Sequence, residues 1–285
     1  MAISILTNIP SLLAQSRLSR HTRDLYQTYT RLSTGLRINK ASDDAAGLAI
    51  ADTLRADTRI AQQAILNTND ALSVLAVADG GLNEIGNILT RLLELAETSA
   101  NGVYTTTNRS PIQAEFSALM SEITRISRVT SFNGVNLLSG ASAMAFQVGL
   151  NSSANSQIIY AGVNGTLQAL GLGDGTEAHG YSVNAQNNTA AQNAAFAAIH
   201  GVQAAIQNLS SFRGAIGSAE SRLSTAVNEL RVRRENYATA EDTIRSADIA
   251  QEAANLVRQQ ILQQAATAIL VQANQTPALA LSLLS

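Results

Sequence analysis

One long, proline-free segment carries apolar residues at alternating steps of three and four, and this repeat limits the possible folds most strongly. The segment runs from about Ala45 to Asn101. Its apolar positions are Leu75, Ala78, Leu82, Ile85, Leu89, Leu92 and Ala96. This spacing is that of a coiled-coil seam, whose side chains all face a partner helix. A helix over the whole segment is about 80 Å long, which is too long for the core of a compact globule.

A second seam of the same kind lies in the C-terminal half. Its positions are Phe212, Ile216, Ala219, Leu223, Ala226 and Leu230, preceded in a shifted phase by Ile199, Val202, Ile206 and Leu209. Between the seams, Ala145–Val148 and Gln157–Ala161 have the pattern of short strands joined by a hairpin loop. The sequence therefore predicts a mainly α protein: an elongated coiled-coil bundle of two antiparallel halves, with a small β-hairpin region in the middle.

The first long helix is predicted to end near residue 101, and the chain then reverses direction. Asn101-Gly102 is a typical left-handed helix cap, and Thr105–Pro111 has the composition of a turn. Ile112 to Ile126 is then helical by pattern and predicts a second helix that runs back along the first.

Composition excludes several kinds of site. The chain has no cysteine, and therefore no disulfide, thiolate ligand or cysteine nucleophile. The net charge of −2 argues against a general polyanion binder. The basic cluster at the start of the chain favours a solvated or inter-subunit helix face over nucleic-acid binding. Its members are Arg17, Arg20, Arg23, Arg31, Arg37 and Lys40.

Residues that could carry catalysis are scattered. His21, His179 and His200 have no metal-binding spacing, and Gly171–Gly175 lacks the strand, lysine and helix of a phosphate loop. The pair Asp43-Asp44 precedes a helical pattern, where acids more often cap the helix than bind metal. We therefore expect no catalytic residue, no metal and no cofactor.

Membrane and export signals are equally sparse. No secretory signal is evident, and no apolar run approaches the roughly 18 residues of a membrane span. By these rules alone the chain is expected in the cytoplasm.

The two ends have an unusual apolar pattern. The last forty residues interleave glutamines with aliphatic residues, so the helical pattern has a broad, poorly separated apolar face. Ordering about 80 terminal residues costs on the order of 100 kcal/mol in conformational entropy, which two helices in water do not offset. We expect the ends to be disordered in the monomer and to fold on self-assembly. The residues predicted to form that assembly core are Leu12, Leu13, Leu256, Ile261, Leu262, Ile269 and Leu270.

Several motifs resemble those of one family. They include the Arg31–Ala51 joint, Phe132-Asn-Gly-Val135, Gln259-Gln-Ile-Leu-Gln-Gln264 and Val271-Gln-Ala-Asn-Gln-Thr-Pro277. Together the matches cover roughly residues 1–140 and 190–285 and resemble bacterial flagellin, in a short form without large outer domains. The resemblance implies a subunit that polymerises into the flagellar filament used for swimming.

The resemblance divides the chain into five parts. They are an N-terminal inner-core helix (1–44), the N-terminal half of a rod (45–140), a hairpin region (141–190), the C-terminal half of the rod (191–240) and a C-terminal inner-core helix (241–285). The joint between the first two parts is predicted to contain a hinge and helix cap formed by Gly35, Asp43, Asp44 and Gly47.

The resemblance also implies partners and a location. Flagellins are exported through the flagellar type III apparatus without a cleaved signal, are held before export by a chaperone on the C-terminal segment (here about Ala247–Ser285), and meet hook-associated and cap proteins at the extracellular flagellum. Two alternatives remain: a hook–filament junction protein with flagellin-like ends, and a secreted helical ligand or adhesin that acts as a monomer.

A Toll-like immune receptor reads one surface in this family. Arg91, Leu95 and Glu115 fit that surface, whereas Thr90 and Leu93 depart from the usual pattern. The alternative is that Arg91 and Glu115 form only an exposed ion pair between two helices.

Overall fold

The structure is a computed structural model that describes residues 7–140, 143–173 and 180–282, with the backbone alone from 276. The chain forms two compact units. Unit 1 contains Met1–Thr58 and Glu235–Ser285, and unit 2 contains Arg59–Arg234. The division between the units lies within two long helices, and the five-part division of the sequence stays a prediction.

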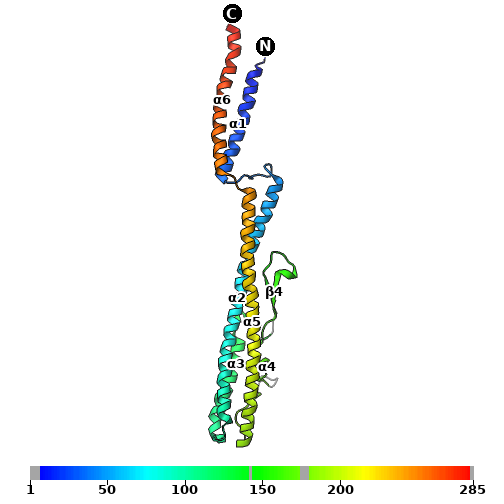
Figure 1. Ribbon diagram of the computed structural model, residues 1–285, viewed down its shortest axis with the longest axis vertical. Coiled ribbons are helices and arrows are strands. Elements are labelled where there is room, and N and C mark those ends of the chain that lie inside the picture. The colour runs from blue at the N-terminus through cyan, green and yellow to red at the C-terminus, as the bar shows by residue number, and fades with distance from the viewer. Residues whose placement is uncertain (1–6, 141–142, 174–179, 283–285) are drawn as a thin grey trace. The chain divides into compact units, whose positions relative to one another are not determined.

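Three long helices build unit 2, and two of them continue into unit 1; one runs antiparallel to the other two (Figure 1). They are α2 (Ala45–Ala100), α3 (Thr106–Val129) and α5 (Asn188–Arg245). Arg213 of α5 pairs with Asp79 of α2 at 2.8 Å, and Gln192 donates to the Ala100 carbonyl at 3.3 Å. These contacts fix the antiparallel register of α2 and α5.

The seams of the sequence lie at the centre of unit 2. The seven seam positions of α2, from Leu75 to Ala96, are completely buried. On α5, Ile216, Ala219, Leu223 and Leu230 are buried, and Phe212 packs against the same core half-buried. The 3–4 spacing therefore identifies the side of each helix that faces its neighbours.

The start of α3 differs from the prediction. The stretch Thr105–Pro111 was expected to be a turn, but Thr105 caps the helix by accepting from the Asn108 amide, and Pro111 lies within it. Pro111 is the sixth residue of α3, beyond the first turn, so its missing N–H removes one backbone hydrogen bond from the helix.

Two hairpins and a short helix follow α3. β1 (Ser131–Phe132) pairs with β2 (Val135–Asn136), and β3 (Met144–Gln147) pairs antiparallel with β4 (Gln157–Tyr160). The second pair matches the predicted hairpin within one residue at each strand end. Its buried side chains, with those of α4 (Leu167–Leu170), extend the core of the three helices.

Unit 1 contains the terminal helices α1 (Ile9–Thr34) and α6 (Ile249–Ser282), which lie side by side and antiparallel (Figure 1). Asn8 donates to the Ala273 carbonyl at one end of the pair, and Arg31 binds Glu252 at the other, both within 3.2 Å. Both predicted terminal segments are thus helical in the structure. Whether they become so only on assembly stays a prediction.

Some predictions fall outside the described residues. His179, residues 174 and 175 of the predicted glycine-rich loop, and residues 283–285 of the tail are among them. Among the helices that the structure describes, none is both long and apolar enough to cross a membrane.

Candidate assembly surface

The α1–α6 pair buries small apolar residues and leaves large ones exposed. Over residues 9–34 and 249–275, whose side chains the structure describes, the buried apolar residues of the two helices are Ala14, Ala266 and Ala273. The exposed large apolar residues are Ile9, Leu12, Leu13, Tyr26, Tyr29, Ile249, Val257, Ile261, Leu262, Ile269 and Val271. Burial of apolar area stabilises a fold roughly in proportion to that area. Two helices that meet through alanines therefore bury little and leave most of their apolar surface for another partner.

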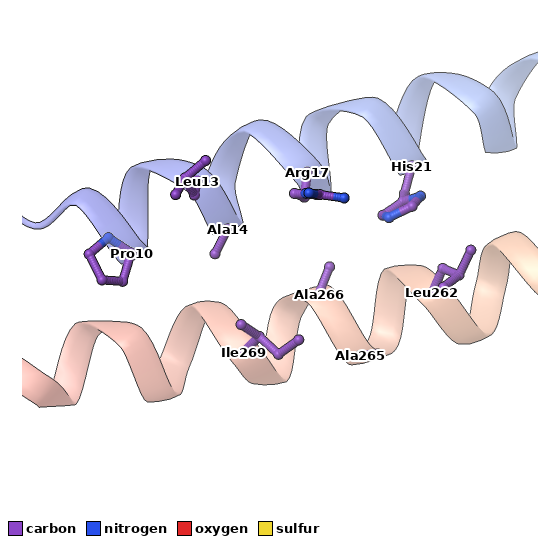
Figure 2. A pocket seen from close by; sticks show the side chains of 9 residues that line it. All are labelled: Pro10, Leu13, Ala14, Arg17, His21, Leu262, Ala265, Ala266 and Ile269. Atoms are coloured by element: carbon purple, nitrogen blue, oxygen red, sulfur yellow. The ribbon is translucent and has the colours of Figure 1, made fainter.

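A groove of about 490 Å³ lies between the two helices (Figure 2). Ala14 and His21 point from α1 toward α6, and Leu262 and Ile269 point from α6 toward α1. The Nδ1 atom of His21 is buried and has no hydrogen-bond partner among the described residues. Arg17 is the charged residue of the lining. The groove is thus mainly apolar and has a shape that takes side chains rather than a polar ligand.

The residues predicted to form the assembly core lie on this pair and remain accessible. Leu12 is 73% exposed, and Ile261 and Ile269 are nearly 60% exposed. Leu256 and Leu270 are half-buried. Leu13 and Leu262 line the groove from opposite helices.

The two chain segments at the joint are bonded to each other. Gly35 ends α1 in the left-handed conformation (φ 70°), which glycine adopts without strain. Its carbonyl accepts from the Ala247 amide at 2.9 Å, and the Arg37 amide donates to the Arg245 carbonyl at 2.7 Å. The Arg37 guanidinium adds a bond to the Ile244 carbonyl. We call these cross-bonded segments, residues 35–37 and 244–247, the clasp.

The two predicted cap residues, Asp43 and Asp44, have different hydrogen-bond partners. Asp44 accepts from the Gly47 amide at 2.9 Å and so caps α2. Asp43 reaches backwards and accepts from the amides of Lys40 and Asn39, bonds that lower the pKa of its carboxyl. A side chain at Gly47 would meet the Asp44 carboxylate at 2.3 Å, so this glycine makes room for the cap.

The receptor-type residues lie on unit 2. Arg91 donates to Glu115 at 2.8 Å and to Glu94 at 2.9 Å, and these contacts raise its pKa. Arg91 and Glu115 are exposed, whereas Leu95 is only 5% exposed. The ion pair between α2 and α3 is therefore present, and recognition by a receptor stays a prediction.

Sequence reasoning missed Arg109, a fully buried cation. It donates to the carbonyls of Ser99 and Asn101 and to the side-chain oxygen of Asn188, at 2.8–3.2 Å. No pattern in the sequence marks it, because its three acceptors come from two distant segments and two of them are backbone atoms.

The histidines lie far apart along the chain. Over residues 7–140, 143–173 and 180–282, no three His, Cys, Asp or Glu side chains gather as metal ligands would. His200 is exposed on α5, and His21 faces the terminal groove.

Comparison with known proteins gives the family. Two family models match the chain: the bacterial flagellin N-terminal helical region over residues 5–143, and the C-terminal helical region over residues 199–284. The flagellar filament 33 kDa core protein of Treponema phagedenis is 35% identical over 97% of this chain and 98% of its own length. The flagellin of Bacillus subtilis is 36% identical over the same shares.

Two further similar proteins belong to the same comparison. Polar flagellin F of Vibrio parahaemolyticus is 30% identical over the full length of both chains. A crystal structure of Bacillus cereus flagellin aligns with 58% of this chain and 88% of that one, at 28% identity and a TM-score of 0.47. With both terminal regions matched by family models and relatives covering nearly its whole length, the chain belongs to the bacterial flagellin family of filament subunits.

Proposed function

We propose that copies of this chain polymerise into an extracellular bacterial flagellar filament, and that the outward faces of α1 and α6 form its inner core. One observation carries the proposal: among the described side chains, the apolar residues that the terminal pair buries are alanines, while many of its leucines and isoleucines stay exposed. A monomer that leaves these side chains in water gains little from pairing the helices, whereas a polymer buries them.

The magnitudes favour assembly. Full burial of one leucine or isoleucine stabilises by about 1.5–3 kcal/mol. With Leu12, Leu13, Ile261, Ile269 and Val271 exposed on each copy, contact with neighbouring copies provides on the order of 10 kcal/mol per subunit. Part of this offsets the entropy lost when the terminal segments become ordered.

The exposed apolar surface of the terminal helices also suggests how export and cap proteins bind this chain. We propose that a chaperone covers the C-terminal segment, residues 247–285, before export through the flagellar type III apparatus. The exposed apolar side chains of α6 support this, because an uncovered surface of this kind promotes premature association. Contacts with cap and hook-associated proteins would use the same terminal helices.

The main alternative is a junction protein between hook and filament. It is not favoured, because the relatives are named as filament core proteins and flagellins. The family is structural, and we propose that this chain acts without catalysis. We further propose that the exposed Arg91 and Glu115, together with the nearly buried Leu95, form the site that a Toll-like receptor recognises.

Charge placed on the terminal surface tests the proposal. Leu13→Asp and Ile269→Asp each put a carboxylate at an exposed position, so the rod should remain folded. We expect either change to lower the rate of seeded filament growth at least about tenfold, because a desolvated carboxylate costs several kcal/mol. Filament length on seeds is measured by electron microscopy. Val77→Asp, the same kind of change at an exposed position of α2, is the matched control.

Two results would contradict the proposal. One is wild-type protein that fails to elongate seeds. The other is a Leu13→Asp or Ile269→Asp protein that grows as fast as Val77→Asp. Removal of Gln259–Ser285 should abolish growth while circular dichroism still shows cooperative melting of unit 2.

A further inference from the structure

Three asparagine–glycine steps occur in the sequence, and the fold holds them differently. They are Asn101-Gly102, Asn133-Gly134 and Asn164-Gly165. An asparagine followed by glycine can cyclise, because the glycine amide nitrogen is not crowded by a side chain of its own residue when it approaches the asparagine amide carbon. The reaction needs a free side-chain carbonyl, a free glycine amide and a backbone that can change shape.

The fold closes the step at Asn164. Its Oδ1 accepts from the Thr166 amide at 3.1 Å, and the Gly165 amide donates to the Leu138 carbonyl at 2.8 Å. Gly165 is buried, and a side-chain carbon there would meet Ile85 at 3.3 Å. Both reacting groups are therefore occupied, and the close packing leaves little room for the backbone to rotate.

The step at Asn101 is held at two atoms. Its Oδ1 accepts from the Val103 amide at 3.1 Å, and its main-chain carbonyl accepts from the buried Arg109 at 3.0 Å. A side-chain carbon on Gly102 would meet Gln192 at 2.8 Å. The asparagine side chain and the backbone that would have to turn are thus fixed by their partners.

The step at Asn133 is open. Asn133 and Gly134 form the two-residue turn between β1 and β2, and their φ angles of 48° and 79° are both positive, as a tight turn of this kind requires. Both residues are exposed, and neither the Asn133 side chain nor the Gly134 amide forms a hydrogen bond within the described residues. A side-chain carbon on Gly134 would meet no atom within 4 Å.

The hairpin that carries this turn can open locally. β1 and β2 have two residues each, and all four are exposed. A two-stranded hairpin by itself is marginally stable in water, so a turn of this size samples other backbone shapes while the core stays folded. Attack by the Gly134 nitrogen requires such a change of shape, and the open space around Gly134 allows it.

We propose that Asn133 is the site at which this chain deamidates spontaneously, with water as the only co-reactant. The Gly134 amide nitrogen loses its proton to base and bonds to Cγ of Asn133, and the side-chain nitrogen takes up a proton and leaves as ammonia. Water then opens the resulting five-membered succinimide at either carbonyl carbon. The products are aspartate and isoaspartate, in which the main chain runs through the former side chain.

The modification changes the turn and lies beyond the proposed assembly. Either product adds a negative charge between β1 and β2. Isoaspartate also lengthens the main chain by one carbon, which disturbs the pairing of Phe132 with Val135. The reaction takes place in the free subunit and does not depend on the terminal helices.

Peptide mass spectrometry of the full-length protein tests the proposal. The subunit is incubated under mildly alkaline conditions in water labelled with heavy oxygen, which marks each residue whose amide is replaced. We expect Asn133 to convert at least about tenfold faster than Asn101 and Asn164, since the other two must first break hydrogen bonds. Isoaspartate should form beside aspartate at residue 133, because the ring opens to both products.

Unfolding and a variant supply the controls. In concentrated guanidinium chloride the three steps should convert at rates within about threefold of one another, because each asparagine then has the same glycine neighbour and no tertiary partners. Asn133→Asp places a residue that tolerates the turn, and should remove most of the ammonia released by the folded protein.

Equal conversion of the three asparagines in the folded protein would overturn the inference, as would aspartate without isoaspartate at residue 133. A ranking that persists in guanidinium chloride would refute the role of the fold. Filament growth is not measured in these experiments, so none of the results bears on the terminal-helix proposal.

Discussion

Two adjacent and chemically identical acids at the joint have different partners. Asp44 lies immediately before α2 and accepts from an amide of its first turn, whereas Asp43 accepts from two amides that precede it. The sequence predicts capping by the pair, and Asp44 does cap the helix. The partners of Asp43 were not predictable, because they depend on how the backbone turns between Lys40 and Asp43.

Acid should weaken the turn that Asp43 holds. The hydrogen bonds from the Lys40 and Asn39 amides lower the carboxyl pKa in the folded chain. A depressed pKa means that the stabilisation is complete above the unfolded value of about 3.9 and is lost as the pH falls through the lower folded value. The Lys40 amide resonance, followed by NMR between about pH 2 and pH 6, should shift at a midpoint below 3.9.

The variant Asp43→Asn is the control for this titration. It has no ionisable group at the position, so the Lys40 amide resonance should not show the transition. A midpoint at or above the ordinary aspartate value in the wild-type protein would refute the proposed role of the two amide bonds.

At the scale of elements, Arg109 joins the ends of three helices. It belongs to α3, and its donors reach the last turn of α2, the residue that follows α2, and the first residue of α5. The carbonyl end of a helix carries partial negative charge, so the C-terminus of α2 compensates a buried cation that has no carboxylate partner among the described residues.

Replacement of Arg109 should therefore destabilise the protein. We expect Arg109→Met to lower the free energy of unfolding by about 2–4 kcal/mol, because the buried carbonyls of Ser99 and Asn101 lose their donors. Arg125→Met removes an exposed arginine from the same helix, and should cost less than about 1 kcal/mol. Chemical denaturation followed by circular dichroism measures both, and equal losses would contradict the account.

A helix or strand could be predicted from the sequence where a single residue pattern is enough to identify it. The seams of α2 and α5 follow from spacing alone, and the β3–β4 hairpin follows from two short apolar runs. The β1–β2 hairpin was missed although Asn133-Gly134 between its strands is a standard signal for a tight turn. The early start of α3 was missed because Pro111 and its polar neighbours have turn composition, whereas Arg109 among them is held by tertiary contacts.

At the scale of the whole molecule, α1 and α6 are helical with few buried side chains between them. Unit 2, by contrast, is organised around completely buried leucines and isoleucines. The sequence predicted that the two ends differ from the rod, but their pairing register depends on contacts such as Asn8–Ala273 and Arg31–Glu252, which join residues more than 200 positions apart.

Monomer and filament should differ in helix content. Because the α1–α6 contact buries mainly alanines, we expect both helices to be largely unfolded in the isolated monomer and folded in the filament. Hydrogen exchange should be fast throughout residues 9–34 and 249–282 of the monomer, slow in the buried part of α2, and slow in all of them after assembly. A monomer that protects α1 and α6 as well as α2 would contradict this expectation.

The clasp at the joint has a mechanical consequence. A single peptide strand between two helical segments is a swivel, since its backbone bonds rotate with little resistance. Here two strands pass the joint side by side, and the bonds Ala247 to Gly35 and Arg37 to Arg245 tie them together. Rotation of the α1–α6 pair about its long axis would wind one strand around the other and shear these bonds. A joint of this kind resists twist while it can still bend.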